Sequence, residues 1–227
     1  MAVNLESMTT LDGARILVFG ASGGLGSPIV DQLAEAGARL TVSGRSLESS
    51  EHHAVNADLT LPDSARSVIA EAVEHHGGLD GIVIAAGVVA FGAVSEVDDD
   101  TVDELLLLNY LAPLRVMRAA LNTLDQGGFV LNISAVVADK PMPNMGAYSA
   151  SKAAASALLK SVRTEARKSK IRIVDVRPPH TETGLATRPI AGQAPKLPQG
   201  LTADSVAARI VAAIADDETD VGADQFS

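Results

Sequence analysis

The sequence has no cysteine and no tryptophan, and it is poor in other aromatic and in basic residues. Without cysteine it forms no disulfide, thiol nucleophile or thiolate metal site. Four Phe and two Tyr leave a core that must be mostly aliphatic. Its 18 Lys and Arg face 28 Asp and Glu, a formal net charge of −10. This charge argues against a nucleic-acid partner and against docking on an anionic membrane surface.

Long apolar runs are also missing. The most apolar stretch, 81–95, is shorter than the ~20 residues of a membrane helix. The N-terminus lacks the basic region and apolar stretch of a secretory signal. We therefore expect a cytoplasmic protein that does not span a membrane. A content of 47% hydrophobic and 20% charged residues is typical of a globular chain, and the length predicts one domain over 1–227.

Short apolar runs alternate with segments of helical periodicity. The predicted strands are 15–19, 40–43, 54–56, 82–85, 129–134 and 171–176. The predicted helices are 25–36, a segment capped by Thr60 that ends near 75, 101–121, 148–168 and 202–215. This alternation predicts an α/β fold, in which helices cover both faces of a doubly wound parallel β-sheet. The long irregular segment 183–200 is interpreted as a flexible substrate-lid loop.

A glycine-rich turn follows the first predicted strand and opens the first predicted helix. Glycines allow a tight turn and a close approach to the backbone, and the N–H groups at a helix N-terminus bind phosphate. The turn therefore predicts a dinucleotide site, with an ordinary strand–helix turn as the alternative. The predicted cofactor-binding residues here are Gly20, Ser22, Gly23, Gly24, Leu25 and Gly26.

The end of the second strand bears on which dinucleotide is bound. It reads Ser43-Gly44-Arg45-Ser46, without the acid that would bind a ribose 2′-hydroxyl. The Arg45 guanidinium can contact a 2′-phosphate, which favours NADP(H) and leaves NAD(H) as the second choice. In the alternative interpretation, Arg45 lies on the surface or stacks on the adenine.

Four residues form a candidate catalytic set. Tyr148 and Lys152 are four residues apart, so they share one face of a helix. A nearby ammonium should lower the pKa of a phenol toward the working range. Ser134 ends a strand 14 residues before Tyr148, and Asn109 follows four leucines inside an apolar helix. Each has an ordinary alternative, as a surface Tyr–Lys pair or as a packing Asn.

This combination resembles the short-chain dehydrogenase/reductase family, in its NADP-preferring type with a YxxxK active site. The resemblance implies a Rossmann-like fold and hydride transfer between a nicotinamide cofactor and a carbonyl or alcohol substrate. It implies that Ser134 holds the substrate oxygen and that Tyr148 exchanges its proton. Lys152 would bind the nicotinamide ribose and lower the pKa of Tyr148. Asn109 would hold a water beside Lys152.

The resemblance also implies further cofactor contacts. These are Asp58, Leu59, Ala85, Ala86, Gly87, Pro178, Thr181 and Thr183. Asp58 matches an adenine contact of the family, with helix capping or loop solvation as an equal alternative. The chain departs from the family at Ala85, where Asn is common, and at Pro179, where Gly is usual and an N–H is lost. We expect a different support network around Ala85 and altered contacts near Pro179, and His180 stays unassigned.

The substrate is left open among alcohols, ketones, steroids and acyl thioesters. Pro141, Met142, Pro143 and Met145 predict an apolar pocket wall. A non-catalytic NADP-binding redox sensor is the rival interpretation. An epimerase or dehydratase of the same superfamily would need a larger C-terminal domain. The resemblance implies a homodimer or homotetramer, and the small residues along 150–157 would allow the close approach of two helices.

Three charged or metal-like patterns are interpreted as structural. The pairs His52-His53 and His75-His76 are predicted to be solvated helix ends, with no metal. Asp98-Asp99-Asp100 is predicted to start a helix. The acidic segment 216–218 is predicted to be a solvated tail, and the chain end lacks a long closing strand.

Overall fold

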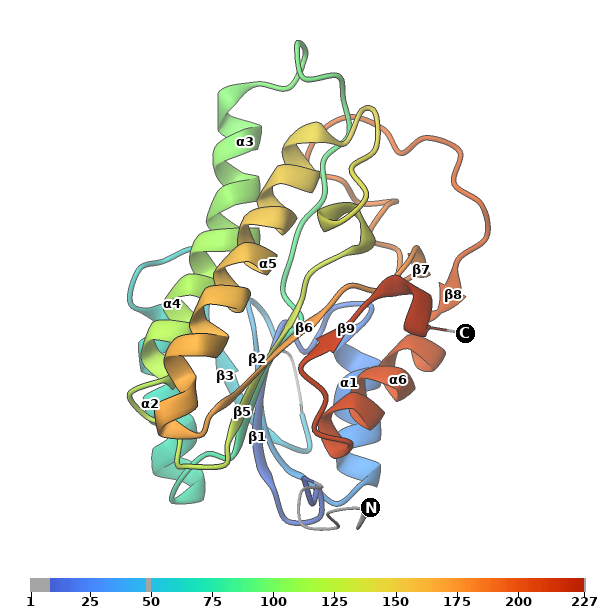
Figure 1. The fold of residues 1–227 in the computed structure, drawn as a ribbon. Coiled ribbons are helices and arrows are strands. Elements are labelled where there is room, and N and C mark those ends of the chain that lie inside the picture. The colour runs from blue at the N-terminus through green and yellow to red at the C-terminus, as the bar shows by residue number, and fades with distance from the viewer. Residues whose placement is uncertain (1–8, 48–49, 227) are drawn as a thin grey trace.

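The computed structural model describes residues 9–47 and 50–226. Its centre is a parallel sheet of seven strands in the order β3-β2-β1-β4-β5-β6-β9 (Figure 1). The strands are β1 (Arg15–Phe19), β2 (Arg39–Gly44), β3 (His53–Asn56), β4 (Gly81–Ile84), β5 (Phe129–Ile133), β6 (Arg172–Val176) and β9 (Asp220–Val221). All six strand pairs are parallel, which confirms the predicted doubly wound α/β fold.

Helices cover both faces of this sheet (Figure 1). They are α1 (Gly26–Glu35), α2 (Ser64–His76), α3 (Asp99–Leu106), α4 (Ala112–Ala120), α5 (Gly146–Glu165) and α6 (Ala203–Ala215). Helices α1 and α6 pack together on one face, and α2, α4 and α5 pack on the other. In the described part of the chain, no helix has both the length and the apolar run needed to cross a bilayer.

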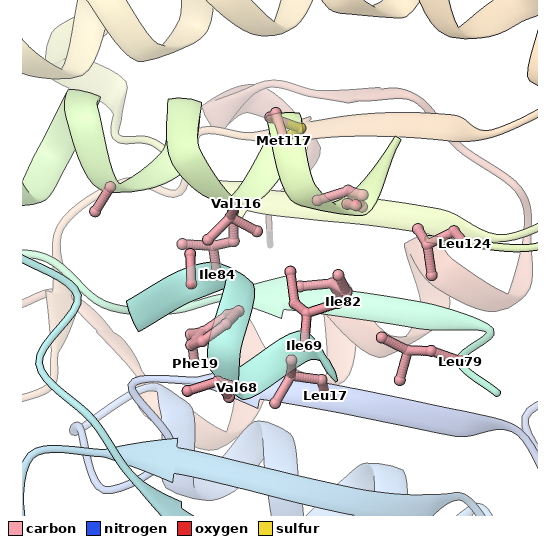
Figure 2. Packing of buried hydrophobic residues seen from close by; sticks show 14 of the residues in the cluster. Leu17, Phe19, Val68, Ile69, Leu79, Ile82, Ile84, Val116, Met117 and Leu124 are labelled. Carbon is pink, nitrogen blue, oxygen red and sulfur yellow. The ribbon is translucent and has the colours of Figure 1, made fainter. Parts of the chain in front are cut away.

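Residues 16–19 of β1 are all apolar because helices cover both faces of the sheet. Ile16 and Val18 pack in the cluster beneath α1 and α6, whereas Leu17 and Phe19 pack in the cluster beneath α2 and α4. All four side chains are fully buried, which stabilises the fold by about 1.5–3 kcal/mol for each. Figure 2 shows Leu17, Phe19, Ile82 and Ile84 of the sheet close to Val68 and Ile69 of α2 and to Val116 of α4. A sheet covered on both faces requires this pattern.

Two predicted helices differ in the structure. The helix predicted over 101–121 divides into α3, a π-helical segment η1 (Leu107–Leu111) and α4. The helix predicted to be capped by Thr60 begins only at Ser64, so that prediction was wrong. The Thr60 hydroxyl donates instead to the Asp58 carboxylate at 2.7 Å, which fixes a turn before the helix.

The acidic chain end is not a solvated tail, which corrects the sequence-based prediction. Asp217 and Glu218 form ion pairs with Arg172 and Arg209, and Asp220 pairs with Arg177. These arginines are all largely buried. The carboxylates of the chain end therefore neutralise the positive charges of Arg172 and Arg177 at β6 and of Arg209 in α6. The closing strand β9 is only two residues long, and it pairs with β6.

Three histidines, His53, His75 and His76, form a cluster in place of two separate solvated pairs. His53 lies in β3 and stacks on His75 at 3.9 Å between ring centroids, and His75 contacts His76 edge-on at 4.6 Å. His75 and His76 do end α2, but His53 is not at a helix end, so that part of the prediction was wrong. Within residues 9–47 and 50–226, no three or more His, Asp or Glu side chains group so as to hold a metal ion. Asp98 caps α3 by accepting from Thr101 N at 2.7 Å, which confirms the predicted helix start.

Candidate functional site

A cavity of about 200 Å³ opens at the carboxyl edge of the sheet. Its wall combines the turn after β1, the end of β5, the first turn of α5 and the segment after β6. In an open α/β sheet this edge is where ligands bind. The predicted site residues in the wall are Gly23, Gly24, Leu25, Ala85, Ser134, Tyr148, Lys152, Pro178, Thr181 and Thr183. The remaining predicted residues do not line this cavity: Gly20, Ser22, Gly26, Arg45, Asp58, Leu59, Ala86, Gly87 and Asn109.

Each of three glycines in the turn after β1 is required by a close backbone contact. Gly20 has φ +76°, and a Cβ there would overlap the backbone of Ala86. A Cβ on Gly26 would overlap the Gly20 carbonyl, and one on Gly24 would overlap the Thr183 carbonyl. The turn is therefore packed between the end of β4 and the segment after β6.

The same turn has unused hydrogen-bond donors. No hydrogen bond within the described chain takes the N–H groups of Gly24 and Leu25, which stand at the start of α1. Such N–H groups, together with the helix dipole, favour an anion. The free donors fit the diphosphate of a dinucleotide.

Arg45 and Asp58 lie just beyond the carboxyl ends of β2 and β3. Arg45 is exposed just beyond β2. Ser22 lies close to the backbone at the end of β2, since its Oγ is 3.1 Å from the position that a Cβ on Gly44 would take. The Asp58 carboxylate accepts from the hydroxyl and the N–H of Thr60. These bonds, with a smaller contribution from the Arg45 charge, lower the pKa of Asp58. The Leu59 side chain packs in the apolar core, so only its backbone is open to a ligand.

Tyr148 and Lys152 lie on the buried face of α5, as their spacing predicts. Each is only 6% exposed. Burial raises the pKa of the Tyr148 phenol above its ordinary value, so the predicted lowering by the Lys152 ammonium is not seen in this structure. Burial lowers the pKa of Lys152 to about 8, and the negative charge of Asp175 opposes this shift. Lys152 Nζ donates to the carbonyl of Ile133 at 3.0 Å.

Asn109 lies in η1, and its amide joins two segments. Its Oδ1 accepts from Val88 N at 3.1 Å, and its Nδ2 donates to Val88 O at 2.9 Å and to Ser151 Oγ at 3.0 Å. Ser151 Oγ in turn donates to the carbonyl of Tyr148. Asn109 thus connects the segment after β4 to the helix that carries Tyr148. This network supports the segment although position 85 is Ala and not the Asn common in the family. Its predicted role in holding a water stays a prediction.

Ser134 is placed differently from the expectation. The residue is 3% exposed, and its hydroxyl donates to Asp175 Oδ1 at 2.6 Å while it accepts from Asn132 Nδ2 at 3.1 Å. Asp175 also accepts from Ser156 and from Arg177. The hydroxyl predicted to hold a substrate oxygen is therefore already bonded to a buried carboxylate. The sequence analysis missed Asp175 and Arg177, although charged residues in and just after the apolar run 171–176 were a usable signal.

The rest of the cavity wall is apolar. Met142 and Met145 line it as predicted, whereas Pro141 and Pro143 are not among the described residues in the wall. Further apolar lining comes from Val89, Phe91, Val136, Leu185, Ala186 and Leu197. The His180 ring edges the cavity, with Nε2 3.5 Å from the Glu182 carboxylate.

The segment 183–200 contributes Leu185, Ala186 and Leu197 to the wall. It is tied down in its middle, because Ile190 N donates to Val89 O and Phe91 N donates to Ala191 O. Its two ends are joined by β7 (Thr181–Glu182) and β8 (Leu201–Thr202). Its predicted function as a flexible lid stays a prediction.

Comparison with known proteins gives related sequences over most of the chain. The family model described as short chain dehydrogenase matches residues 14–193. The chain is 33% identical over 212 residues to an uncharacterized oxidoreductase of Methylorubrum extorquens, covering 87% of this chain and 85% of that protein. It is 31% identical to a versicolorin reductase of Emericella nidulans, over 77% of this chain and 72% of that protein. It is also 31% identical to a cyclic-di-GMP-binding biofilm dispersal mediator protein of Escherichia coli, over 81% and 80%.

Solved structures share the fold over nearly the whole chain. A short chain dehydrogenase from Burkholderia cenocepacia in complex with NADP is 26% identical and has a TM-score of 0.82, covering 96% of this chain and 98% of that one. A 3-ketoacyl-(acyl-carrier-protein) reductase from Brucella melitensis, complexed with NADH, has a TM-score of 0.82 at 20% identity, with 96% and 100% covered. Proteins of this fold therefore bind either cofactor.

The low pKa of buried Lys152 leads to a prediction about stability and pH. Lys152→Met removes a group with a pKa of about 8 in the folded chain and an ordinary value of 10.5. Between about pH 8 and pH 10 the unfolded wild type holds more protons at this position, so this group makes the wild type more stable as pH rises. The free energy of unfolding of the wild type, relative to Lys152→Met, should therefore increase by roughly 1–3 kcal/mol over this range.

Urea unfolding at several pH values measures this difference. The exposed Lys168, changed to Met, is the matched control, and it should leave the pH dependence of the wild type unchanged. A Lys152→Met variant with the same pH dependence as the wild type would show that Lys152 is not desolvated in the folded chain.

Proposed function

Because the chain belongs to the short-chain dehydrogenase/reductase family, we propose that it transfers a hydride between a nicotinamide cofactor and a carbonyl or alcohol substrate. The observation that carries this proposal is the buried Tyr148–Lys152 pair at an apolar cavity next to the glycine-rich turn. An acid–base group in an apolar cavity suits the transfer of a proton to or from a substrate oxygen.

The proposed cofactor is NADP(H), with NAD(H) as the second choice. The free N–H groups of Gly24 and Leu25 would hold the diphosphate, and the exposed Arg45 would pair with a 2′-phosphate. Pro178, Thr181 and Thr183 would flank the nicotinamide, although Thr181 Oγ1 already donates to Pro179 O. When bound, the cofactor supplies or accepts the hydride.

Tyr148 is proposed to move the proton. Its raised pKa keeps the phenol protonated at neutral pH, which is the form needed to donate a proton to a carbonyl oxygen. The Lys152 ammonium on the same helix face would stabilise the phenolate that remains. The same groups serve both directions of the reaction, and the versicolorin reductase named above is consistent with the reductive one.

The proposed substrate is an apolar carbonyl compound. The methionines, Phe91 and the leucines in the wall leave little besides Tyr148, His180 and the threonines to pair with polar groups. The segment 183–200 would cover the bound substrate as a lid. The NADP-preference, the cytoplasmic location and the pairing of copies into a dimer or tetramer remain predictions.

A non-catalytic dinucleotide sensor is the second candidate. The relative named as a cyclic-di-GMP-binding mediator of biofilm dispersal favours it, because that name describes binding rather than catalysis. A buried acid–base pair has no use in a protein that only binds, so we place the sensor function second. Cofactor binding without turnover on a broad panel of carbonyl compounds would reverse this order.

Tyr148→Phe tests the proposed acid. The loss of a general acid should lower kcat by about 10²–10⁴-fold while the affinity for NADPH stays the same, since the ring still fills its place. Turnover is measured as NADPH oxidation on a substrate found in a carbonyl panel, and affinity by cofactor fluorescence. Tyr110→Phe, at the only other tyrosine, is the control and should keep full activity. Full activity in Tyr148→Phe would sink the proposed mechanism.

Arg45→Ala tests the cofactor choice. Losing a charge-assisted bond to a 2′-phosphate should weaken NADPH binding roughly tenfold or more, with little change for NADH. Fluorescence titrations of both cofactors measure the two dissociation constants. Arg167→Ala, at an exposed arginine beyond the far end of α5, is the matched control and should change neither. Equal losses for both cofactors, or none, would reject a 2′-phosphate contact.

A further inference from the structure

A buried polar cluster lies beside the cavity, centred on Asp175 of β6. Asp175 is fully buried, and three side chains donate to its carboxylate. Ser134 donates to Oδ1 at 2.6 Å, and Ser156 and Arg177 donate to Oδ2 at 2.5 and 2.7 Å. Two hydroxyls from different elements, the end of β5 and the middle of α5, thus make matching bonds to one charge.

These bonds use the donor capacity of Ser134. A hydroxyl has one proton to donate, and this proton goes to Asp175. Its oxygen also accepts from Asn132. To hold a substrate oxygen, Ser134 would have to withdraw its proton from a buried carboxylate, which would leave that charge with one donor fewer.

The side chain that follows Ser134 points the other way. Ala135 has extended backbone angles, φ −167° and ψ 159°, so its side chain and that of Ser134 lie on opposite sides of the chain. Ala135 is half-buried, lines the cavity and packs against the apolar cluster that includes Tyr148. The position that faces the phenol at the end of β5 is therefore Ala135.

We propose that Ser134 is a positioning residue bound to Asp175, and that Tyr148 holds the reacting oxygen without a serine, with Ala135 beside it. This inference rests on the proposed oxidoreductase function. Asp175 ties the end of β5 to α5 through Ser134 and Ser156, and Ser156 is one turn beyond Lys152. In this way the polar cluster holds α5, the helix that carries Tyr148, against the sheet.

The test compares Ser134→Ala with Ser156→Ala, because both remove one hydroxyl from the same carboxylate. If Ser134 serves only Asp175, the two variants should have kcat/KM values within about fivefold of each other, and both should stay far above Tyr148→Phe. Ser134→Ala falling as far as Tyr148→Phe, while Ser156→Ala keeps its activity, would overturn the inference.

A stability measurement separates this inference from the proposed function. Both serine variants should lower Tm by similar amounts of a few degrees, whatever reaction the protein performs. An unchanged Tm in Ser134→Ala alone would show that its bond to Asp175 is not made, and would reject the inference without any assay of turnover. Failure of the oxidoreductase proposal would instead appear as full activity in Tyr148→Phe.

Two further variants test what the cluster does. Asp175→Asn removes the negative charge that favours the Lys152 ammonium, so the alkaline limb of kcat/KM should move to lower pH, which a purely structural role would not cause. The other charged group at Asp175 is Arg177, which keeps Asp139 and Asp220 as partners. Ala135→Ser places a hydroxyl on the Tyr148 side and should raise kcat/KM. No rise, or a fall, would reject Ala135 as the neighbour of the reacting oxygen.

Discussion

The buried carboxylate of Asp175 is the constraint on which this edge of the sheet depends. A fully buried charge is tolerated only when it is paired and hydrogen-bonded. Arg177 neutralises Asp175, and it also pairs with Asp139 after β5 and with Asp220 of β9. The buried charge of Asp175 is therefore satisfied only when β5, β6, β9 and α5 are packed together, and β5, β6 and α5 also lead into the wall of the cavity.

The cluster and the cavity divide the polar and apolar parts of the site. On the cluster side, two hydroxyls and an arginine donate to the Asp175 carboxylate, and the Asn132 amide donates to the Ser134 hydroxyl. On the cavity side, apolar walls surround Tyr148 and raise the pKa of its phenol, which holds a proton ready for a substrate oxygen. Lys152 lies between the two sides, since it is buried with Tyr148 and senses the charge of Asp175.

Much of the fold could be predicted from the sequence, because it depends on local patterns. Strand β1 and the glycine-rich turn are visible as an apolar run followed by residues that tolerate close contacts, and the spacing of Tyr148 and Lys152 fixes their shared face. The π-helical segment at Asn109 could not be predicted, because one extra residue per turn leaves no trace in a run of leucines. Ion pairs of the chain end join residues far apart in sequence.

The direction of Ser134 shows the limit of reasoning from spacing. A shift of one residue at a strand end reverses the face to which a side chain points. The order of Ser, Tyr and Lys along the chain was therefore compatible with a serine on either side of β5. The buried Asp175 decides the side, and its role depends on contacts that the sequence does not display.

Hydride transfer itself tests the central claim most directly. A single turnover with NADPH carrying deuterium at the transferable C4 position is run on a carbonyl substrate, and the product is examined by mass spectrometry. We predict that the wild type places one deuterium on the carbinol carbon of the product, and that Tyr148→Phe does so about 10²–10⁴-fold more slowly. Tight NADPH binding with no deuterium transferred to any compound of a broad carbonyl panel would contradict the account and favour a binding protein.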